Sequence, residues 1–246
     1  MTPRRGHAEG LEVPRDFNAP TVVIVHGAWV DATAWREVIA LLQAAGLGVV
    51  AVQNPLSALA DDVDAVTRAI DQQRGPVVLV GHGYGGTVIT QAGNHSRVAA
   101  LVYVAAFAPN SGESTTDAQD YPPLACIGGL EVDSGGFLYL APDVVLEFLA
   151  QDLPAPECRV LAATQQPIRA SALLDRVADA AWRSRPSWYI VSEGDRMISP
   201  GLQRRIASRI GASVLGLPAD HVPFLSKPSE TAGAIGAAVD HVRGKC

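Results

Sequence analysis

The sequence lacks any stretch typical of a membrane span or a secretion signal. No apolar run approaches the roughly 20 residues that a spanning helix needs. Arg4 and Arg5 lie near the start, but no apolar segment follows them, which argues against a signal peptide. We therefore expect residues 1–20 to form a polar, flexible leader, and we expect a soluble, cytoplasmic protein.

Cysteine is scarce, and charge of one sign is never concentrated. The three cysteines, Cys126, Cys158 and Cys246, show no disulfide or metal-binding spacing, so a reducing compartment is expected. The formal net charge is −6 without any block of like charges, so neither nucleic acid nor a membrane is an expected partner. Because H-E-x-x-H, Walker and C-x-x-C motifs are also absent, we expect no metal and no organic cofactor.

What the sequence does contain is an alternation of short apolar runs with helical patterns. Its 246 residues, of which 48% are hydrophobic, suffice for one α/β domain with a sizeable core. Strands that alternate with helices predict a mostly parallel central sheet flanked by helices. The strands are expected at 21–25, 49–52, 77–80, 98–106, 188–191 and 213–217, and the main helices at 34–44, 59–70, 200–210 and 229–242.

The alternation is interrupted between residues 109 and 185. This segment contains stretches rich in Gly, Pro and acidic residues, with short helical patterns at 142–150 and 169–182. A structureless loop of that length would be unusual in a compact domain. We therefore predict a mainly helical cap, inserted after the strand near 98–106, within a domain that spans residues 21–246.

A glycine-rich turn, GHGYGG at residues 81–86, follows the third expected strand. Strand, tight turn and helix in this order match the nucleophile elbow G-x-S-x-G, in which a serine occupies the sharp turn. Gly81, Gly85 and Gly86 would let strand and helix approach closely. The centre of the motif is Gly83, which has no attacking atom. A nucleotide-binding glycine loop is the alternative, but that loop normally follows the first strand.

Two more polar residues follow expected strands at the same edge of the sheet, where open α/β folds bind ligands. Asp195 comes after the strand at 188–191, and His221 comes after the strand at 213–217. Elbow, acid and histidine in this order are the chain order of a hydrolase triad. In such a triad the histidine takes the nucleophile's proton, and the buried acid holds the imidazole in one tautomer.

Neighbouring residues are weaker candidates for these roles. Asp220 adjoins His221 and is poorly placed to orient that ring, so Glu193 is the fallback acid. Ser111 and Ser192 lie outside the turn, which makes neither a good displaced nucleophile.

The chain resembles the α/β-hydrolase superfamily, in particular small capped bacterial esterases related to plant hydroxynitrile lyases. The resemblance lies in the stretches VIVHGAWVDATAW, VVLVGHGYGGTVIT, VAALVYVAAFAPNSGES, PSWYIVSEGDRMISP and DHVPFLSKP. It implies the α/β-hydrolase fold, with Asp195 as the triad acid, His221 as the base and the backbone amides of Ala28 and Tyr84 as an oxyanion hole. The family's serine corresponds to Gly83, so covalent acyl-enzyme chemistry cannot proceed at this position.

Three further residues are candidates for the substrate-binding region. His26 and His82 flank the expected site, and we interpret them as scaffold residues that hydrogen-bond its loops. Trp29, together with aromatic residues of the cap, is expected to line the apolar wall of a pocket.

Four functions are open to a hydrolase-like chain without this serine. The first is an esterase for small, largely apolar carboxylic esters, inactive or strongly impaired as written. The second is general-base catalysis of the lyase or cofactor-free oxygenase type, in which His221 and Asp195 activate water or a substrate C–H or O–H. The third is a small-molecule-binding pseudoenzyme, and the fourth is a structural or interaction protein. The expected partner is a small molecule, and a homodimer is our working expectation for the oligomeric state.

Overall fold

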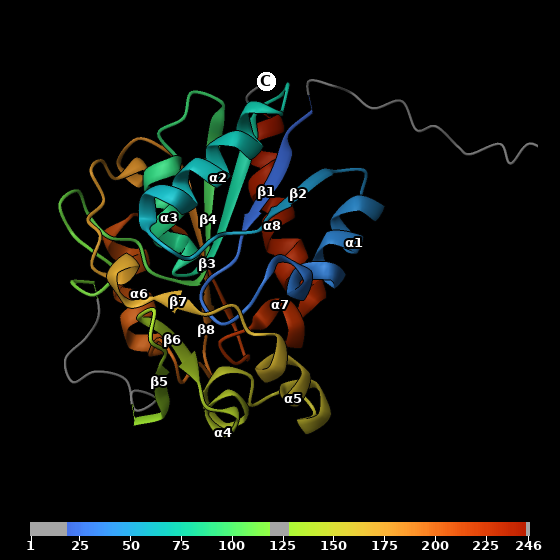
Figure 1. Cartoon of the computed structure of the whole chain (residues 1–246). Helices are drawn as coiled ribbons and strands as arrows, with labels where there is room; N and C mark the ends of the chain where they lie inside the picture. The colour runs from blue at the N-terminus through green and yellow to red at the C-terminus, as the bar shows by residue number, and fades with distance from the viewer. Residues whose placement is uncertain (1–18, 119–127, 245–246) are drawn as a thin grey trace, which may run out of the picture.

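A computed structural model describes residues 19–118 and 128–244 of the chain. Its centre is a six-stranded, fully parallel sheet in the order β2-β1-β3-β4-β8-β9 (Figure 1), which confirms the predicted parallel sheet. Residues 1–18 of the expected leader, Cys126 and Cys246 lie outside the described residues. The strands are β1 (Thr21–Val25), β2 (Gly48–Val52), β3 (Val77–Gly83), β4 (Val98–Ala106), β8 (Ser187–Ser192) and β9 (Ser213–Leu217).

Helices cover both faces of this sheet, because successive side chains of its buried strands point to opposite sides. Val23 and Leu79 belong to one buried apolar core, whereas Val22 and Val78 belong to a second. The first core includes α2 (Leu59–Asp71), α3 (Gly85–Ala92) and α6 (Pro200–Arg209), and the second includes α1 (Arg36–Ala44) and α8 (Pro228–Arg243). Within the described residues, no helix is both long and apolar enough to cross a membrane.

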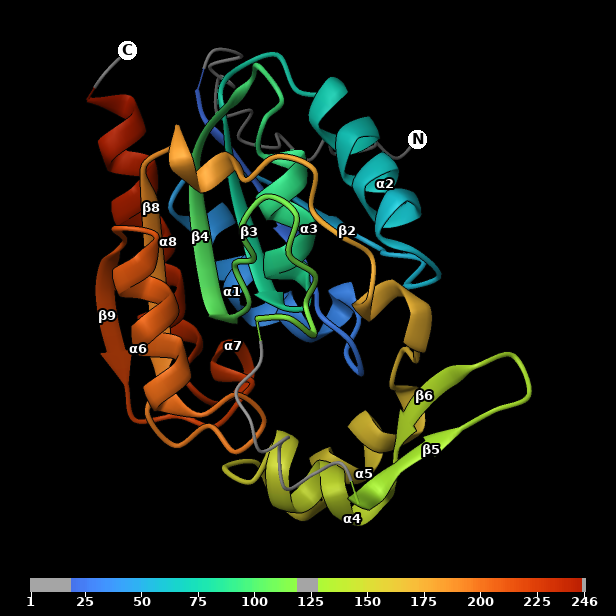
Figure 2. The same cartoon turned by 90° about the vertical axis from the view of Figure 1, so that its left-hand side faces the viewer.

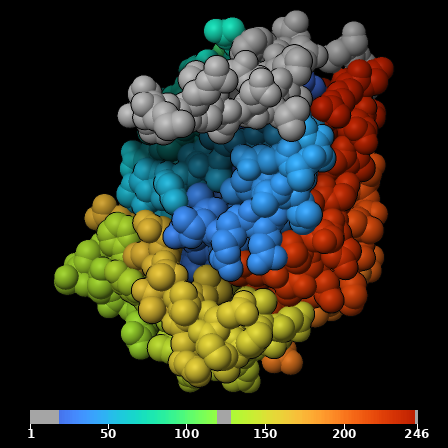
Figure 3. Space-filling view, turned by 90° about the vertical axis from the view of Figure 1, so that its right-hand side faces the viewer, coloured from blue at the N-terminus to red at the C-terminus, as the bar shows by residue number. Residues whose placement is uncertain are grey.

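The segment between β4 and β8 lies over the carboxyl ends of the parallel strands (Figure 2). On the face drawn in Figure 3, its green and yellow atoms form one layer against the body of the molecule. The segment contains a three-stranded antiparallel sheet, the short helix α4 (Pro142–Val144), a π-helical turn (Val145–Leu149) and α5 (Ala155–Thr164). Its strands are β5 (Leu130–Val132), β6 (Phe137–Leu140) and β7 (Ile168–Arg169).

The prediction of a helix at 169–182 is wrong. This stretch holds the end of β7, a 3-10 turn (Ala170–Leu173) and the start of another (Ala181–Arg183). Its backbone pairs with distant partners instead of itself: the N–H of Val177 donates to the carbonyl of Glu113, and that of Ala178 donates to the side chain of Gln91. These tertiary hydrogen bonds override the local helical pattern.

Candidate active site

Gly83 ends β3 and occupies the sharp turn before α3. Its φ is +53°, in the left-handed region that is costly for most side chains. The neighbouring glycines are required by packing, because a Cβ at Gly85 or Gly86 would overlap the carbonyl oxygen of Val25 or Phe107. At Gly83, by contrast, a Cβ would fit, and its nearest neighbour would be Nε2 of His221 at 3.4 Å.

His221 follows β9, and its Nδ1 lies 2.7 Å from Oδ2 of Asp195, in the loop after β8. Both side chains are almost wholly buried. A carboxylate can only accept a hydrogen bond, so Nδ1 carries the proton and Nε2 of the neutral ring presents a lone pair. That lone-pair nitrogen is the atom beside Gly83. The structure therefore brings Gly83, Asp195 and His221 together.

The carboxylate of Asp195 receives four hydrogen bonds. Oδ1 accepts the backbone N–H groups of Met197 and Ile198, at 2.7 and 2.9 Å. Oδ2 accepts Nε2 of Gln203, at 2.7 Å, in addition to His221. Gln203 lies on α6 and was not expected from the sequence; only its place eight residues after the acid, on a helix that starts next to this loop, could have suggested it.

The other candidates for acid and nucleophile are engaged elsewhere. Glu193 forms an ion pair with Arg204 at the surface. Oγ of Ser111 accepts the N–H of Ala180. The hydroxyl of Ser192 is buried and has no hydrogen-bond partner among the described residues. It is therefore not hydrogen-bonded to His221.

The two histidines beside the site hold its loops. The ring of His26 accepts the N–H of Asn54 at Nε2, and its Nδ1 lies 2.8 Å from the carbonyl of Gly27, so both nitrogens are used. Nε2 of His82 donates to the carbonyl of His221 over 2.9 Å, which fixes the backbone of the candidate base. Burial lowers the pKa of both His26 and His82, and the nearby His221 lowers that of His82 further. Both rings are therefore neutral near pH 7.

Trp29 connects the loop after β1 with the segment that covers the site. Its backbone N–H donates to the carbonyl of Gln166 over 2.8 Å, and its indole Nε1 donates to the carbonyl of Leu138 over 3.0 Å. Its φ of +63° is strained for a residue with a large side chain. These contacts set the path of the backbone at Ala28, directly before it.

Tyr84 follows Gly83 and has a buried partner that the sequence reasoning missed. Its hydroxyl donates to Oδ2 of Asp62 on α2, over 3.0 Å, and Oδ1 of Asp62 accepts the N–H of Leu56. Burial raises the pKa of Asp62 to about 6, although the two hydrogen bonds oppose the shift. Asp62 lies in the first turn of α2, where the helix dipole also favours an acid. Its closeness to the apolar stripe of α2 was the available signal.

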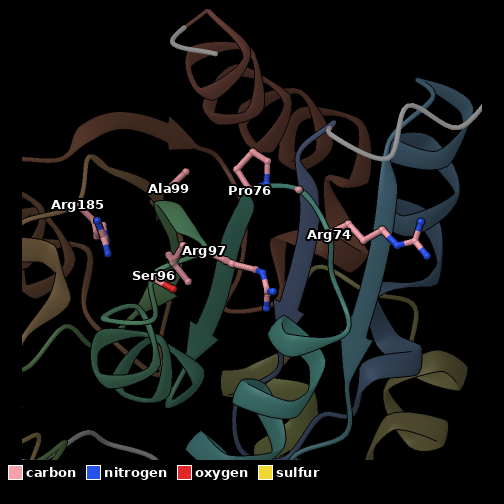
Figure 4. Close-up of a pocket in the computed structure, with 8 residues that line it drawn as sticks. Arg74, Pro76, Ser96, Arg97, Ala99 and Arg185 are labelled. Atoms are coloured by element: carbon pink, nitrogen blue, oxygen red, sulfur yellow. The ribbon is translucent and has the colours of Figure 1, made fainter.

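A separate open pocket of about 560 Å³ lies at the opposite edge, beside the first residues of β3 and β4 (Figure 4). Two of its guanidinium groups hold the fold, since Arg97 is paired with Asp71 and Arg185 donates to two backbone carbonyls. Asp195 and His221, called the dyad below, follow the carboxyl ends of β8 and β9, at the other edge of the sheet. This pocket is therefore not part of the candidate active site.

The comparison with known proteins agrees with the fold. Residues 22–234 match the model of the alpha/beta hydrolase family, and the chain therefore belongs to this family. A probable hydrolase from a Phoma species is 27% identical over 243 residues, covering 88% of this chain and 96% of its own. Putative methylesterase 11 of Arabidopsis thaliana is 27% identical over 259 residues, covering 93% of this chain and 66% of its own.

Solved structures share the architecture. A pyrethroid hydrolase from Sphingobium faniae superposes with a TM-score of 0.76 at 21% identity, covering 90% of this chain and 98% of its own. Polyneuridine aldehyde esterase superposes with a TM-score of 0.75 at 19% identity, covering 89% of this chain and 98% of its own. At this level of identity the likeness concerns the fold.

Proposed function

We propose that this protein is a carboxylic ester hydrolase scaffold for small, largely apolar esters, strongly impaired because Gly83 stands where the elbow motif carries serine. Three relatives named for ester chemistry or hydrolysis support the class: a methylesterase, an aldehyde esterase and a pyrethroid hydrolase. The buried Asp195–His221 pair supplies the general base.

One observation carries this proposal. A Cβ on Gly83 would lie 3.4 Å from Nε2 of His221, with no closer neighbour, at a backbone φ of +53°. A serine hydroxyl attached there would have the imidazole within reach as its proton acceptor, which is the arrangement that activates a serine nucleophile. A glycine that only eased a tight turn would not require a hydrogen-bonded histidine beside it.

The backbone around the turn supports an oxyanion hole. Among the backbone hydrogen bonds outside helices and strands, the N–H groups of Ala28 and Tyr84 have no acceptor within residues 19–118 and 128–244. The two amides belong to loops that meet at Gly27, whose Cβ would lie 3.3 Å from the nitrogen of Tyr84. Backbone amides of this kind stabilise the negative charge that develops on an ester carbonyl oxygen.

Gly83→Ser tests the proposal against p-nitrophenyl acetate and butyrate. We expect kcat/KM to rise by at least about a thousand-fold, since losing the serine of a triad costs up to about a million-fold. Gly83→Ala is the matched control: it adds the same Cβ without the oxygen and should give no gain. If neither variant gains activity, the pocket does not perform serine ester hydrolysis.

General-base catalysis without a covalent intermediate is the second candidate. It is favoured by Asp195 keeping all four of its hydrogen bonds, including the one to Nδ1 of His221, although no serine is present. In an ester hydrolysis of this type, His221 would take a proton from water as the water attacks the carbonyl, and acid and alcohol would leave. His221→Ala would then abolish the activity of the unsubstituted chain, while Gly83→Ser would not increase it. Saturable ligand binding without turnover in any variant would instead indicate a binding protein.

A further inference from the structure

One segment of the cap, residues 147–152, is hydrogen-bonded to both loops of the dyad. The side chain of Gln151 donates to the carbonyl of Gly194 over 2.7 Å, directly before Asp195. The guanidinium of Arg196, directly after Asp195, donates to the carbonyl of Glu147 over 2.8 Å. The acid is therefore held from the cap on both of its sides in the chain.

The histidine loop is held by a reciprocal pair of hydrogen bonds. The N–H of Asp220 donates to Oδ2 of Asp152 over 2.8 Å, and the N–H of Asp152 donates to Oδ2 of Asp220 over 3.2 Å. Oδ1 of Asp220 accepts the N–H of Val222 and the hydroxyl of Ser226. The carboxylate of Asp220 thus holds the backbone after His221, and the carboxylate of Asp152 holds the backbone before it.

Apolar packing also joins the cap to the loop that carries His221. Val145, Leu149 and Ala150 of the cap share one buried cluster with Val222 and Phe224 of the histidine loop. Phe224 stacks on Trp35 with ring centroids 4.1 Å apart and also contacts the ring of His82. A shift of residues 147–152 would therefore reach the backbone that carries the imidazole.

We propose that Asp152 is a positioning residue for His221: by holding the backbone N–H of Asp220, it fixes the imidazole between Asp195 and Gly83. Its role in catalysis rests on the proposed function, whereas its effect on the geometry of the imidazole does not. The cap thereby takes part in setting the base as well as covering the site. Displacing a catalytic group by about 1 Å can cost up to a hundred-fold in rate.

Two variants separate this role from mere attachment of the cap. Asp152→Ala removes the acceptor, whereas Asp152→Asn keeps an oxygen that can accept the N–H of Asp220. Asn94→Ala is the matched control, because it removes a different hydrogen bond to the same insertion, from Asn94 to the carbonyl of Asp179 at 2.8 Å. That bond is remote from both loops of the dyad.

The first experiment measures the geometry of the imidazole in the chain with Gly83 retained, and it needs no enzymatic activity. The Nδ1 proton of His221, shared with Asp195, should give a protected, strongly downfield proton NMR signal. We expect the signal to be lost or broadened in Asp152→Ala, and to be retained in Asp152→Asn and Asn94→Ala. An unchanged signal in a folded Asp152→Ala overturns the proposal, as does equal loss in Asn94→Ala. If Asp152→Ala does not fold, Asp152→Asn decides, and loss of its signal overturns the proposal.

The second experiment measures ester hydrolysis in the Gly83→Ser background. Asp152→Ala should lower kcat about tenfold with KM within twofold, and Asp152→Asn should restore at least half of kcat. A rise in KM alone would overturn the proposal, because it would indicate a role in substrate binding. If Gly83→Ser itself hydrolyses no ester, the proposed function fails, and the NMR result still decides the role of Asp152.

Discussion

Each carboxylate oxygen of Asp195 accepts two hydrogen bonds. These four hydrogen bonds compensate for the burial of the acid beside His221. A buried carboxylate without partners would be costly. Two backbone N–H groups and Gln203 hold one orientation, in which only Oδ2 faces His221. The imidazole is thereby restricted to the tautomer that leaves Nε2 free toward Gly83.

In the Gly83→Ser background, Asp195→Asn should lower kcat by about a thousand-fold or more, since an amide can donate to the histidine and favour the wrong tautomer. Steady-state hydrolysis of p-nitrophenyl butyrate measures this loss. Glu193→Gln provides the control, because Glu193 pairs with Arg204 at the surface. A loss in Glu193→Gln as large as in Asp195→Asn would mean that the acid is assigned to the wrong residue.

The sequence was informative about residues whose role depends on chain order. Asp195 and His221 each follow a strand of a parallel sheet, so their meeting at one edge could be predicted. Gln203, Asp62 and Asp152 could not be, because each acts through a contact between elements that are distant in the chain or through burial. Asp62 lies beside the apolar stripe of α2 while Asp61 next to it is exposed, but this pattern does not reveal that Asp62 bonds the hydroxyl of Tyr84.

At the scale of elements, the turn at Gly83 depends on how β3, β4 and α3 meet. The register between β3 and β4 shifts after His82, and Ala105 has a φ of +43° at that point. The hydroxyl of Tyr189 bonds both the N–H and the carbonyl of Ala106, which fixes the irregular end of β4. The carbonyl of Gly83 then accepts the N–H of Phe107. The site is thus built where the regular ladder ends.

Gly86→Ala should destabilise the protein by at least about 2 kcal/mol, because its Cβ would overlap the backbone carbonyl of Phe107, and backbone cannot move as a side chain can. Gly233→Ala is the opposite case. Nothing lies within 4 Å of its Cβ on the exposed side of α8, so helix propensity should stabilise it by about 0.5 to 1 kcal/mol. Urea denaturation measures both changes, and equal effects would contradict this account of packing.

The regular elements were predictable, whereas the cap was predictable only in part. Repeating apolar patterns predicted the strands and the flanking helices to within a few residues. The hairpin of β5 and β6 was not expected, although the segment Asp133–Phe137 contains its turn signal: Oδ1 of Asp133 accepts two N–H groups, and Gly136 has a φ of +77°. Helix α5 was also not expected; it begins after Pro154, within one of the Pro- and acid-rich stretches of the insertion.

At the scale of the whole molecule, the sheet separates two buried cores, and the site lies where the cap meets the carboxyl ends of the strands. Asp62 is buried on α2, one of the helices of the first core, and its carboxylate accepts the hydroxyl of Tyr84, next to the turn at Gly83. Its titration therefore connects the stability of the fold with the region of the site.

Asp62 should make the protein less stable as the pH rises. Burial raises its pKa from 3.8 to about 6. Between these values the unfolded chain ionises while the folded chain stays protonated, so ionisation favours unfolding. Relative to Asp62→Asn, the unsubstituted chain should lose about 2 kcal/mol of stability between pH 4.5 and pH 7. Urea denaturation of both proteins at several pH values measures the difference, which would be independent of pH if Asp62 were not buried as a neutral acid.

We propose that the chain forms a complete serine hydrolase site except for one hydroxymethyl group at position 83. The most direct test treats Gly83→Ser with a fluorophosphonate and locates the adduct by intact mass and peptide mapping. We predict one adduct at position 83, which is lost when His221→Ala is added and is absent from the unsubstituted chain. No adduct, or an adduct at another residue such as Ser192, would contradict the claim.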